Sequence, residues 1–341
     1  MDAEGLSELT RLLEQGEFPN THAVLIEHAG ALIYEAYFEG DDYQGDAELT
    51  RVKFDAHTLH DIRSITKSVT ALLLGLALEE EFEPALKTPI VEFFPDLRDR
   101  VGAGVERITL LQVLTMTAGL DWDERTHPWG SPENDEFLLH TTDRPIELVL
   151  ARSVTAEPGT NWTYNSGMTE LAGGIIERKT GKNVRDFARS VLFGPLGVEE
   201  FEWWGAKTWL PAGMPAASGG LRLRARDLAK IGSLVLHKGR WGGQQVVPTE
   251  VIELIVQPHV DRIGQVANGI LGYGLQWYAG KSTSIPSFPL IGAFGNGGQR
   301  LFILPKQHLV ITVLAGNYNG PYQDNGERMI GRIARAHYGH E

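Results

Sequence analysis

The chain has 341 residues, of which 42% are hydrophobic and 22% charged, so it is long and apolar enough to bury a large core. This composition excludes a disordered, collagen-like or coiled-coil chain. The net charge of −13 disfavours binding to a phosphate backbone, and the absence of cysteine excludes disulfides, thiol nucleophiles and zinc–thiolate centres.

The first 80 residues are expected to form a helix, a hairpin and a second helix. Residues 4–14 place leucines on one helical face, and residues 22–28 and 31–38 are strand-like runs joined at Ala29-Gly30. Residues 64–80 are apolar almost all round, which is typical of a helix buried between layers.

Nothing in the sequence indicates a signal peptide or a membrane span. The first residues are acidic, and the longest apolar run, 69–78, is shorter than the ~20 residues that cross a bilayer. We therefore expect a cytoplasmic location for the chain as given. The periplasm or secretion stays open if a signal has been removed.

The middle of the chain, from about residue 81 to 200, is expected to be helix and loop. Helical spacing marks residues 108–116, 145–151, 167–179 and 184–192. Between the first two of these segments, residues 121–143 form a long acidic stretch that is interrupted by Pro and Gly, which is typical of a functional loop.

Strand patterns return after about residue 215. Two helical segments, 225–237 and 249–256, come first. The strand-like runs that follow are 273–278, 290–294, 299–304 and 309–314, and a final helix is expected over 324–337.

Strands therefore lie at both ends of the chain, with helices between them. This order predicts an α/β (α+β) fold, with an antiparallel sheet built from both termini, flanked by helices, and an inserted, mostly helical domain. We expect residues 1–80 and 215–341 to form the sheet domain, residues 81–214 the helical domain, and the cleft between them the active site.

The sharpest chemical motif is Ser64-Ile65-Thr66-Lys67, the single Ser-x-x-Lys in the chain. Residues three apart share a helical face, so the lysine amine can reach the serine hydroxyl. A buried lysine has a lowered pKa and can then act as the base that a serine nucleophile needs. The alternative is a capping serine followed by a surface lysine.

Two further segments could contribute to a site. Tyr164-Asn165-Ser166 follows a Pro-Gly turn, and a tyrosine near a lysine ammonium would ionise more readily and serve as a base or proton shuttle. Its alternative is a ring packed in the core. Residues 295–299, Gly-Asn-Gly-Gly-Gln, could bring a backbone N–H to a ligand; the alternative is a glycine-rich turn.

The order of these three motifs resembles that of the serine β-lactamase and penicillin-binding protein superfamily. The chain looks most like the class C β-lactamase-like branch, near family VIII-type carboxylesterases and 6-aminohexanoate-dimer hydrolases. Further segments similar to that branch are residues 111–120, 173–177, 218–222, 225–228 and 273–277.

This resemblance implies a role for each matching residue. Ser64 matches the nucleophile that forms the acyl-enzyme, Lys67 the base, and Tyr164 the tyrosine that shares proton transfer. The oxyanion hole would consist of the backbone N–H groups of Ser64 and Gln299. The expected substrate-binding residues are Trp122, Ser166, Asn296, Gly297 and Gly298, with a loop anchor as the alternative for Trp122.

Two departures from the family pattern shape the expected function. Ser166 stands where an asparagine is usual, and Asn296 or Gly295 stands where a cation normally binds a substrate carboxylate. We therefore expect a carboxylesterase or small-amide hydrolase that could hydrolyse β-lactams weakly as a side activity. A true β-lactamase, a D-amino-acid peptidase and a non-turnover acyl-binding sensor on the same scaffold are the alternatives.

The expected partner is a small-molecule ester, amide or lactam, without nucleic acid, and the oligomeric state stays open. We expect no cofactor and no metal, because the eleven histidines show no metal-ligand spacing and His57 with His60 are too few.

Overall fold

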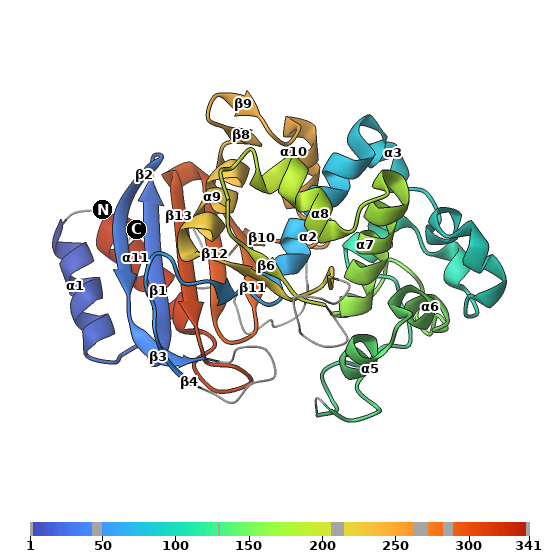
Figure 1. The fold of residues 1–341 in the computed structure, drawn as a ribbon, viewed down its shortest axis with the longest axis horizontal. Helices are drawn as coiled ribbons and strands as arrows, with labels where there is room; N and C mark the ends of the chain where they lie inside the picture. Colours follow the sequence, from blue (N-terminus) through green and yellow to red (C-terminus); the bar gives the residue numbers. More distant parts are fainter. Residues whose placement is uncertain are drawn as a thin grey trace.

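The computed structural model describes residues 3–42, 50–128, 130–205, 215–261, 263, 272–281 and 289–338. Its centre is a six-stranded antiparallel sheet, in the order β10-β11-β12-β13-β1-β2 (Figure 1). The strands of this sheet are β1 (Thr21–His28), β2 (Ala31–Tyr37), β10 (Tyr278–Lys281), β11 (Pro289–Gly295), β12 (Gln299–Leu304) and β13 (Leu309–Ala315).

Small sheets and hairpins surround this main sheet. β5 and β6 flank β7, β3 pairs with β4, and β8 pairs with β9. The bounds of these short strands are β3 (Glu39–Asp42), β4 (Thr50–Lys53), β5 (His60–Asp61), β6 (Glu202–Trp203), β7 (Leu221–Leu223), β8 (Arg240–Trp241) and β9 (Gln244–Gln245).

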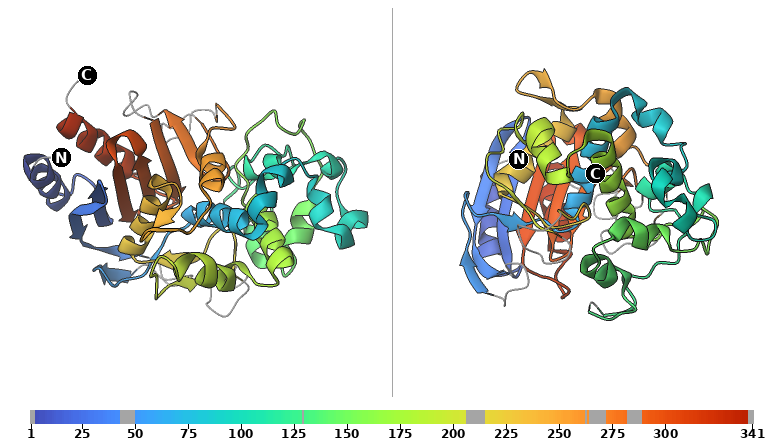
Figure 2. Two further views of the ribbon diagram at one scale, coloured as in Figure 1. Left: turned by 90° about the horizontal axis from the view of Figure 1, so that it is seen from above. Right: turned by 45° about the vertical axis from the view of Figure 1, so that its right-hand side comes forward.

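The helices cover both faces of the sheet and form a second mass beside it (Figure 2). α1 and α11 lie on one face of the main sheet, and α9 and α2 lie on the other. The helices are α1 (Ala3–Glu14), α2 (Ile65–Leu78), α3 (Phe82–Ala85), α4 (Leu110–Leu114), α5 (Asp135–Thr141), α6 (Pro145–Leu150), α7 (Ser166–Thr180), α8 (Val184–Ala188), α9 (Ala225–Leu236), α10 (Thr249–Val256) and α11 (Asn325–Tyr338).

The alternation of side chains along the central strands explains this layering. In β1, Val24 and Ile26 pack toward α1 and α11, whereas Ala23 and Leu25 pack toward α2 and α9. Both faces of the strand are therefore buried at its centre, where residues 23–26 are all apolar.

The predicted fold class is confirmed, since an antiparallel sheet built from both termini is flanked by helices. The predicted division into residues 1–80 with 215–341 and residues 81–214 stays a prediction, because α2 and α7 share one hydrophobic core with the sheet. Among the described residues, no helix is long and apolar enough to cross a membrane.

Three element predictions need correction. Residues 273–278 form a turn closed by a bridge between Tyr273 and Tyr278, with Gln276 at a φ of 62°, and the strand begins only at Tyr278. The helix expected over 184–192 changes to a π-helical segment after Ala188. The stretch 121–143 contains α5, which the acidic composition did not reveal.

A buried ion pair holds α11 against the sheet. Arg300 of β12 is 3% exposed and Glu327 of α11 is 7% exposed, with 2.8 Å between Nε and Oε1. The same guanidinium donates to the carbonyl oxygens of Gly295 and Gln299, so it also fixes the turn between β11 and β12.

Replacing Arg300 with Met should lower the free energy of unfolding by about 3–5 kcal/mol, because Glu327 would be left buried without its charged partner. Denaturant unfolding measures this change. Arg51→Met, which breaks the exposed contact with Glu39, should cost at most about 1 kcal/mol. Equal losses in the two variants would contradict the structural role of the buried pair.

Candidate active site

The first motif lies at the start of α2, the apolar helix that packs between the sheet and α7. Ser64 immediately precedes the helix and is half-buried, and Lys67 follows one turn later. The Lys67 Nζ donates a hydrogen bond of 3.1 Å to Ser64 Oγ and one of 2.9 Å to the Ser218 carbonyl oxygen. The structure thus brings the predicted nucleophile and base together, and the predicted surface alternative for Lys67 is wrong.

The environment of Lys67 lowers the pKa of its amine. Its side chain is 3% exposed, and burial lowers its pKa below the ordinary lysine value. The carboxylates of Glu124, Glu136 and Glu170 act in the opposite direction and raise it. The net shift of the pKa is downward. The neutral form of Lys67, which is the form that accepts a proton, is therefore populated at a lower pH than in a free lysine.

Tyr164 lies close to both Ser64 and Lys67. Its hydroxyl hydrogen-bonds with the Ser64 side chain, and its ring centroid is 5.1 Å from Lys67 Nζ and 4.6 Å from the Arg125 guanidinium carbon. Burial and the Glu124 carboxylate raise the pKa of Tyr164 above the ordinary tyrosine value. The expectation that this tyrosine ionises readily is therefore wrong, and its hydroxyl is suited to donating or relaying a proton.

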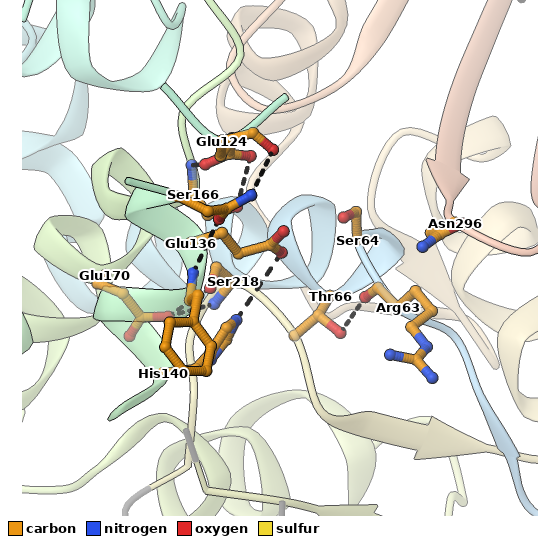
Figure 3. Close-up of polar contacts among 12 residues, drawn as sticks. Arg63, Ser64, Thr66, Glu124, Glu136, His140, Ser166, Glu170, Ser218 and Asn296 are labelled. Atoms are coloured by element: carbon orange, nitrogen blue, oxygen red, sulfur yellow. Dashed lines mark hydrogen bonds and ion pairs between the residues drawn. The ribbon is translucent and has the colours of Figure 1, made fainter. Parts of the chain in front are cut away.

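The buried carboxylate of Glu124 lies next to Ser166 of the second motif (Figure 3). Glu124 accepts hydrogen bonds from the Trp122 indole N–H at 2.7 Å, from the Ser166 backbone N–H at 2.7 Å and from Ser166 Oγ at 3.0 Å. Burial raises the pKa of Glu124. These bonds tie the loop after α4 to the start of α7.

The same bonds show what the side chains of Trp122 and Ser166 contact in this structure. Trp122 is 6% exposed and Ser166 is fully buried, and both side chains point their polar atoms at Glu124. The contact shown for Trp122 is the loop anchor. Their predicted contacts with substrate stay predictions. The side chain of Asn165 is held by a structural hydrogen bond, because it caps α7 by accepting from the Met168 N–H.

Two further acidic residues complete the surroundings of Lys67. Glu170 of α7 accepts bonds from the backbone N–H and Oγ of Ser218, and so holds the carbonyl that Lys67 binds. Glu136 of α5 is half-buried and interacts with His140 (Figure 3). Burial opposes ionisation of Glu136, but the His140 hydrogen bond and the charges of Lys67 and Arg63 lower its pKa overall.

The third motif forms the turn between β11 and β12. Gly297 and Gly298 have φ values of 94° and 96°, a conformation that favours glycine, so the turn alternative describes their backbone. A Cβ on Gly295 would lie 2.5 Å from the Ile62 carbonyl oxygen, so the end of β11 packs directly against the segment before Ser64. Figure 3 shows Asn296 facing the start of α2.

The side chains of this motif are held by neighbours. Asn296 donates to the Asn319 side chain, and Gln299 uses its amide to bridge to Ala315 of β13. Gln299 is the first residue of β12, and it pairs with Gly295 of β11 across the turn. Its role as the second oxyanion donor stays a prediction, as do substrate contacts of Asn296, Gly297 and Gly298.

The cation that the third motif lacks is not replaced by Arg300, which points to Glu327. An exposed cation does lie at the site, since Arg125 covers the ring of Tyr164. Sequence reasoning missed Arg125 and the three glutamates, because none belongs to a recognisable motif.

Comparisons with known proteins agree with this geometry. The chain is 26% identical over 289 residues to the 6-aminohexanoate-dimer hydrolase of Paenarthrobacter ureafaciens, covering 79% of this chain and 69% of that protein. It is 28% identical over 144 residues to the lovastatin esterase of Penicillium rubens, covering 39% of this chain and 32% of that protein.

Solved structures show the same fold. A putative 6-aminohexanoate-dimer hydrolase from Bacillus anthracis superposes with a TM-score of 0.75 at 24% identity, covering 95% of this chain and 81% of that one. A family VIII carboxylesterase superposes with a TM-score of 0.73 at 16% identity, covering 98% of each chain. The Beta-lactamase family model matches residues 9–334, and the chain therefore belongs to the Beta-lactamase family as a serine hydrolase of that fold.

Proposed function

We propose that this serine hydrolase is a carboxylesterase or small-amide hydrolase that works through a covalent acyl-enzyme on Ser64. The observation that carries the proposal is the 3.1 Å bond between Ser64 Oγ and the buried amine of Lys67. A serine hydroxyl needs a base within this reach to become a nucleophile. Relatives named as a dimer hydrolase and an esterase support hydrolysis of amide or ester bonds.

The first half of the reaction forms the acyl-enzyme. Lys67 accepts the Ser64 proton while Oγ attacks the carbonyl carbon of the substrate. The Ser64 N–H and a backbone N–H of the β11–β12 turn, with Gln299 as the sequence-based candidate, would stabilise the oxyanion. Tyr164 donates its hydroxyl proton to the leaving group and recovers a proton from Lys67.

The second half hydrolyses the acyl-enzyme. Water attacks the acyl carbon, and Lys67, with Tyr164 as relay, takes the proton from that water. The same path in reverse returns a proton to Ser64 Oγ as the acid product leaves. The high pKa of Tyr164 suits this relay, because the phenol stays protonated between transfers.

Hydrolysis of carboxylate-bearing substrates, such as β-lactams or D-amino-acid peptides, is the second candidate function. The exposed guanidinium of Arg125 over Tyr164 favours it, since an arginine can bind a carboxylate through two parallel hydrogen bonds. Against it stands the third-motif position, where Asn296 is bonded to Asn319 and carries no charge.

Replacing Ser64 with Ala should reduce ester hydrolysis by at least ~10³-fold without unfolding the protein, because the attacking oxygen is removed. Initial rates with p-nitrophenyl butyrate, together with circular dichroism, test this expectation. Ser190→Ala, at an exposed serine, is the matched control and should keep full activity. A Ser64→Ala variant with normal turnover would show that another residue is the nucleophile.

The neutral ester p-nitrophenyl butyrate should be hydrolysed with a higher kcat/KM than nitrocefin, because Asn296 or Gly295 stands where a cation normally binds a substrate carboxylate. If Arg125 anchors carboxylates, Arg125→Gln should raise the KM for nitrocefin by roughly tenfold and leave the KM for the ester within about twofold. Paired kinetics measure both effects. A higher kcat/KM for nitrocefin in the wild type would favour the second candidate function.

The acidic limb of kcat/KM should move to lower pH in Glu136→Gln. The neutral amine of Lys67 is the active form, so activity rises with pH through the lowered Lys67 pKa. Glu136 raises that pKa, and removing its charge should shift the limb downward by roughly 0.5–1 pH unit. Glu133→Gln, at an exposed acid just before α5, should leave the profile in place. A shift to higher pH, or equal shifts in both variants, would refute the assignment.

A further inference from the structure

Three side chains with metal-binding atoms lie close together outside the active site. His22 of β1, Asp42 of β3 and His60 of β5 are each 1% exposed or less, and their ligand atoms all lie within 4.8 Å of one another. The expectation from sequence that the histidines form no such cluster is wrong, because the tertiary fold brings strands of three different sheets together and their residues lie 18 to 38 positions apart.

The hydrogen bonds around His22 fix which of its nitrogens carries the proton. Asn20 Oδ1 accepts from the Asp41 backbone N–H at 2.8 Å, and Asn20 Nδ2 donates to the Asp41 carbonyl, so the orientation of this amide is determined. His22 Nε2 lies 3.1 Å from Asn20 Oδ1. Because that oxygen only accepts, Nε2 must be the protonated nitrogen of His22.

His60 is oriented in the same way. Its Nδ1 lies 2.9 Å from the carbonyl oxygen of Asp61, which also only accepts, so Nδ1 carries the proton. A neutral imidazole has one N–H. In the neutral rings, His22 Nδ1 and His60 Nε2 therefore both present lone pairs, and these two atoms are 2.8 Å apart.

Two lone pairs at this distance repel each other unless a positive charge lies between them. A shared proton would make one ring a buried imidazolium. Both rings are 1% exposed or less, so such a cation would be removed from water, which is unfavourable. A divalent cation fits better, because the Asp42 carboxylate offers a third, negatively charged ligand.

We propose that His22 Nδ1, His60 Nε2 and a carboxylate oxygen of Asp42 bind a divalent transition-metal ion of the Zn²⁺ class. Two imidazoles and one carboxylate are ligands that Zn²⁺ accepts. Each ring donates its outer N–H to a carbonyl oxygen, as metal-binding histidines commonly do. Tetrahedral Zn–N bonds of ~2.0–2.1 Å place the two nitrogens about 3.3 Å apart, so the rings need separate by only about 0.5 Å.

The neighbours of Asp42 connect this cluster to the nucleophile. The Tyr318 hydroxyl donates to Asp42 Oδ1 at 2.7 Å, and the Arg63 guanidinium lies 4.7 Å from the Tyr318 ring centroid. Arg63 also pairs with Asp61 and directly precedes Ser64. The metal would thus brace β3 and β5 against β1 and stabilise the segment that leads into α2.

Metal titration of the whole protein tests this proposal without reference to activity. The chain is stripped with a chelator, dialysed and titrated with Zn²⁺ by calorimetry. A parallel titration with Co²⁺ is followed by visible absorption. We expect one equivalent of Zn²⁺ per chain, a tetrahedral Co²⁺ spectrum and a rise in Tm of about 5 °C with saturating Zn²⁺.

Variants locate the ion. His60→Gln and Asp42→Asn should lose the Co²⁺ spectrum and the Tm rise, whereas His57→Gln, at an exposed histidine, should keep both. Failure of the stripped wild type to bind Zn²⁺ would overturn the proposal, even if a variant does not fold. Unchanged binding in His60→Gln, or ¹⁵N spectra of the wild type showing an imidazolium at neutral pH in the presence of Zn²⁺, would also overturn it.

Discussion

A lysine amine that is to accept a proton near neutral pH must first lose its own charge, and burial of Lys67 lowers the free energy of that step. α2 achieves the burial, because it is apolar almost all round and packs between the sheet and α7. Ser64 stays half-buried at the start of the same helix. One helix thus supplies a desolvated base and an accessible nucleophile one turn apart.

Carboxylates limit how far this desolvation goes. Glu124, Glu136 and Glu170 favour the ammonium form of Lys67, and each comes from a different part of the helical region. Two of these carboxylates also stabilise the structure. Glu124 joins the loop after α4 to α7, and Glu170 positions the Ser218 carbonyl. The basicity of Lys67 is therefore coupled to the packing of the loops around the site.

The sequence predicted the parts of the site that depend on local geometry. Ser64 and Lys67 meet because residues three apart share a helical face, and the central strands follow from their apolar runs. The glutamates, Arg125 and the cluster of His22, Asp42 and His60 were missed, because only tertiary contacts between distant segments bring them together. The direction of Arg300 and the raised pKa of Tyr164 likewise depend on neighbours that a pattern does not identify.

The acyl-enzyme is the central claim, and mass spectrometry tests it most directly. The protein would be mixed with p-nitrophenyl butyrate, quenched in acid during turnover, digested and mapped. We predict a butyryl group on the peptide that contains Ser64, and its absence from Ser64→Ala treated in the same way. Turnover with an acyl group on another residue, or with none on Ser64 when the acyl-enzyme is trapped at saturating substrate, would contradict the mechanism.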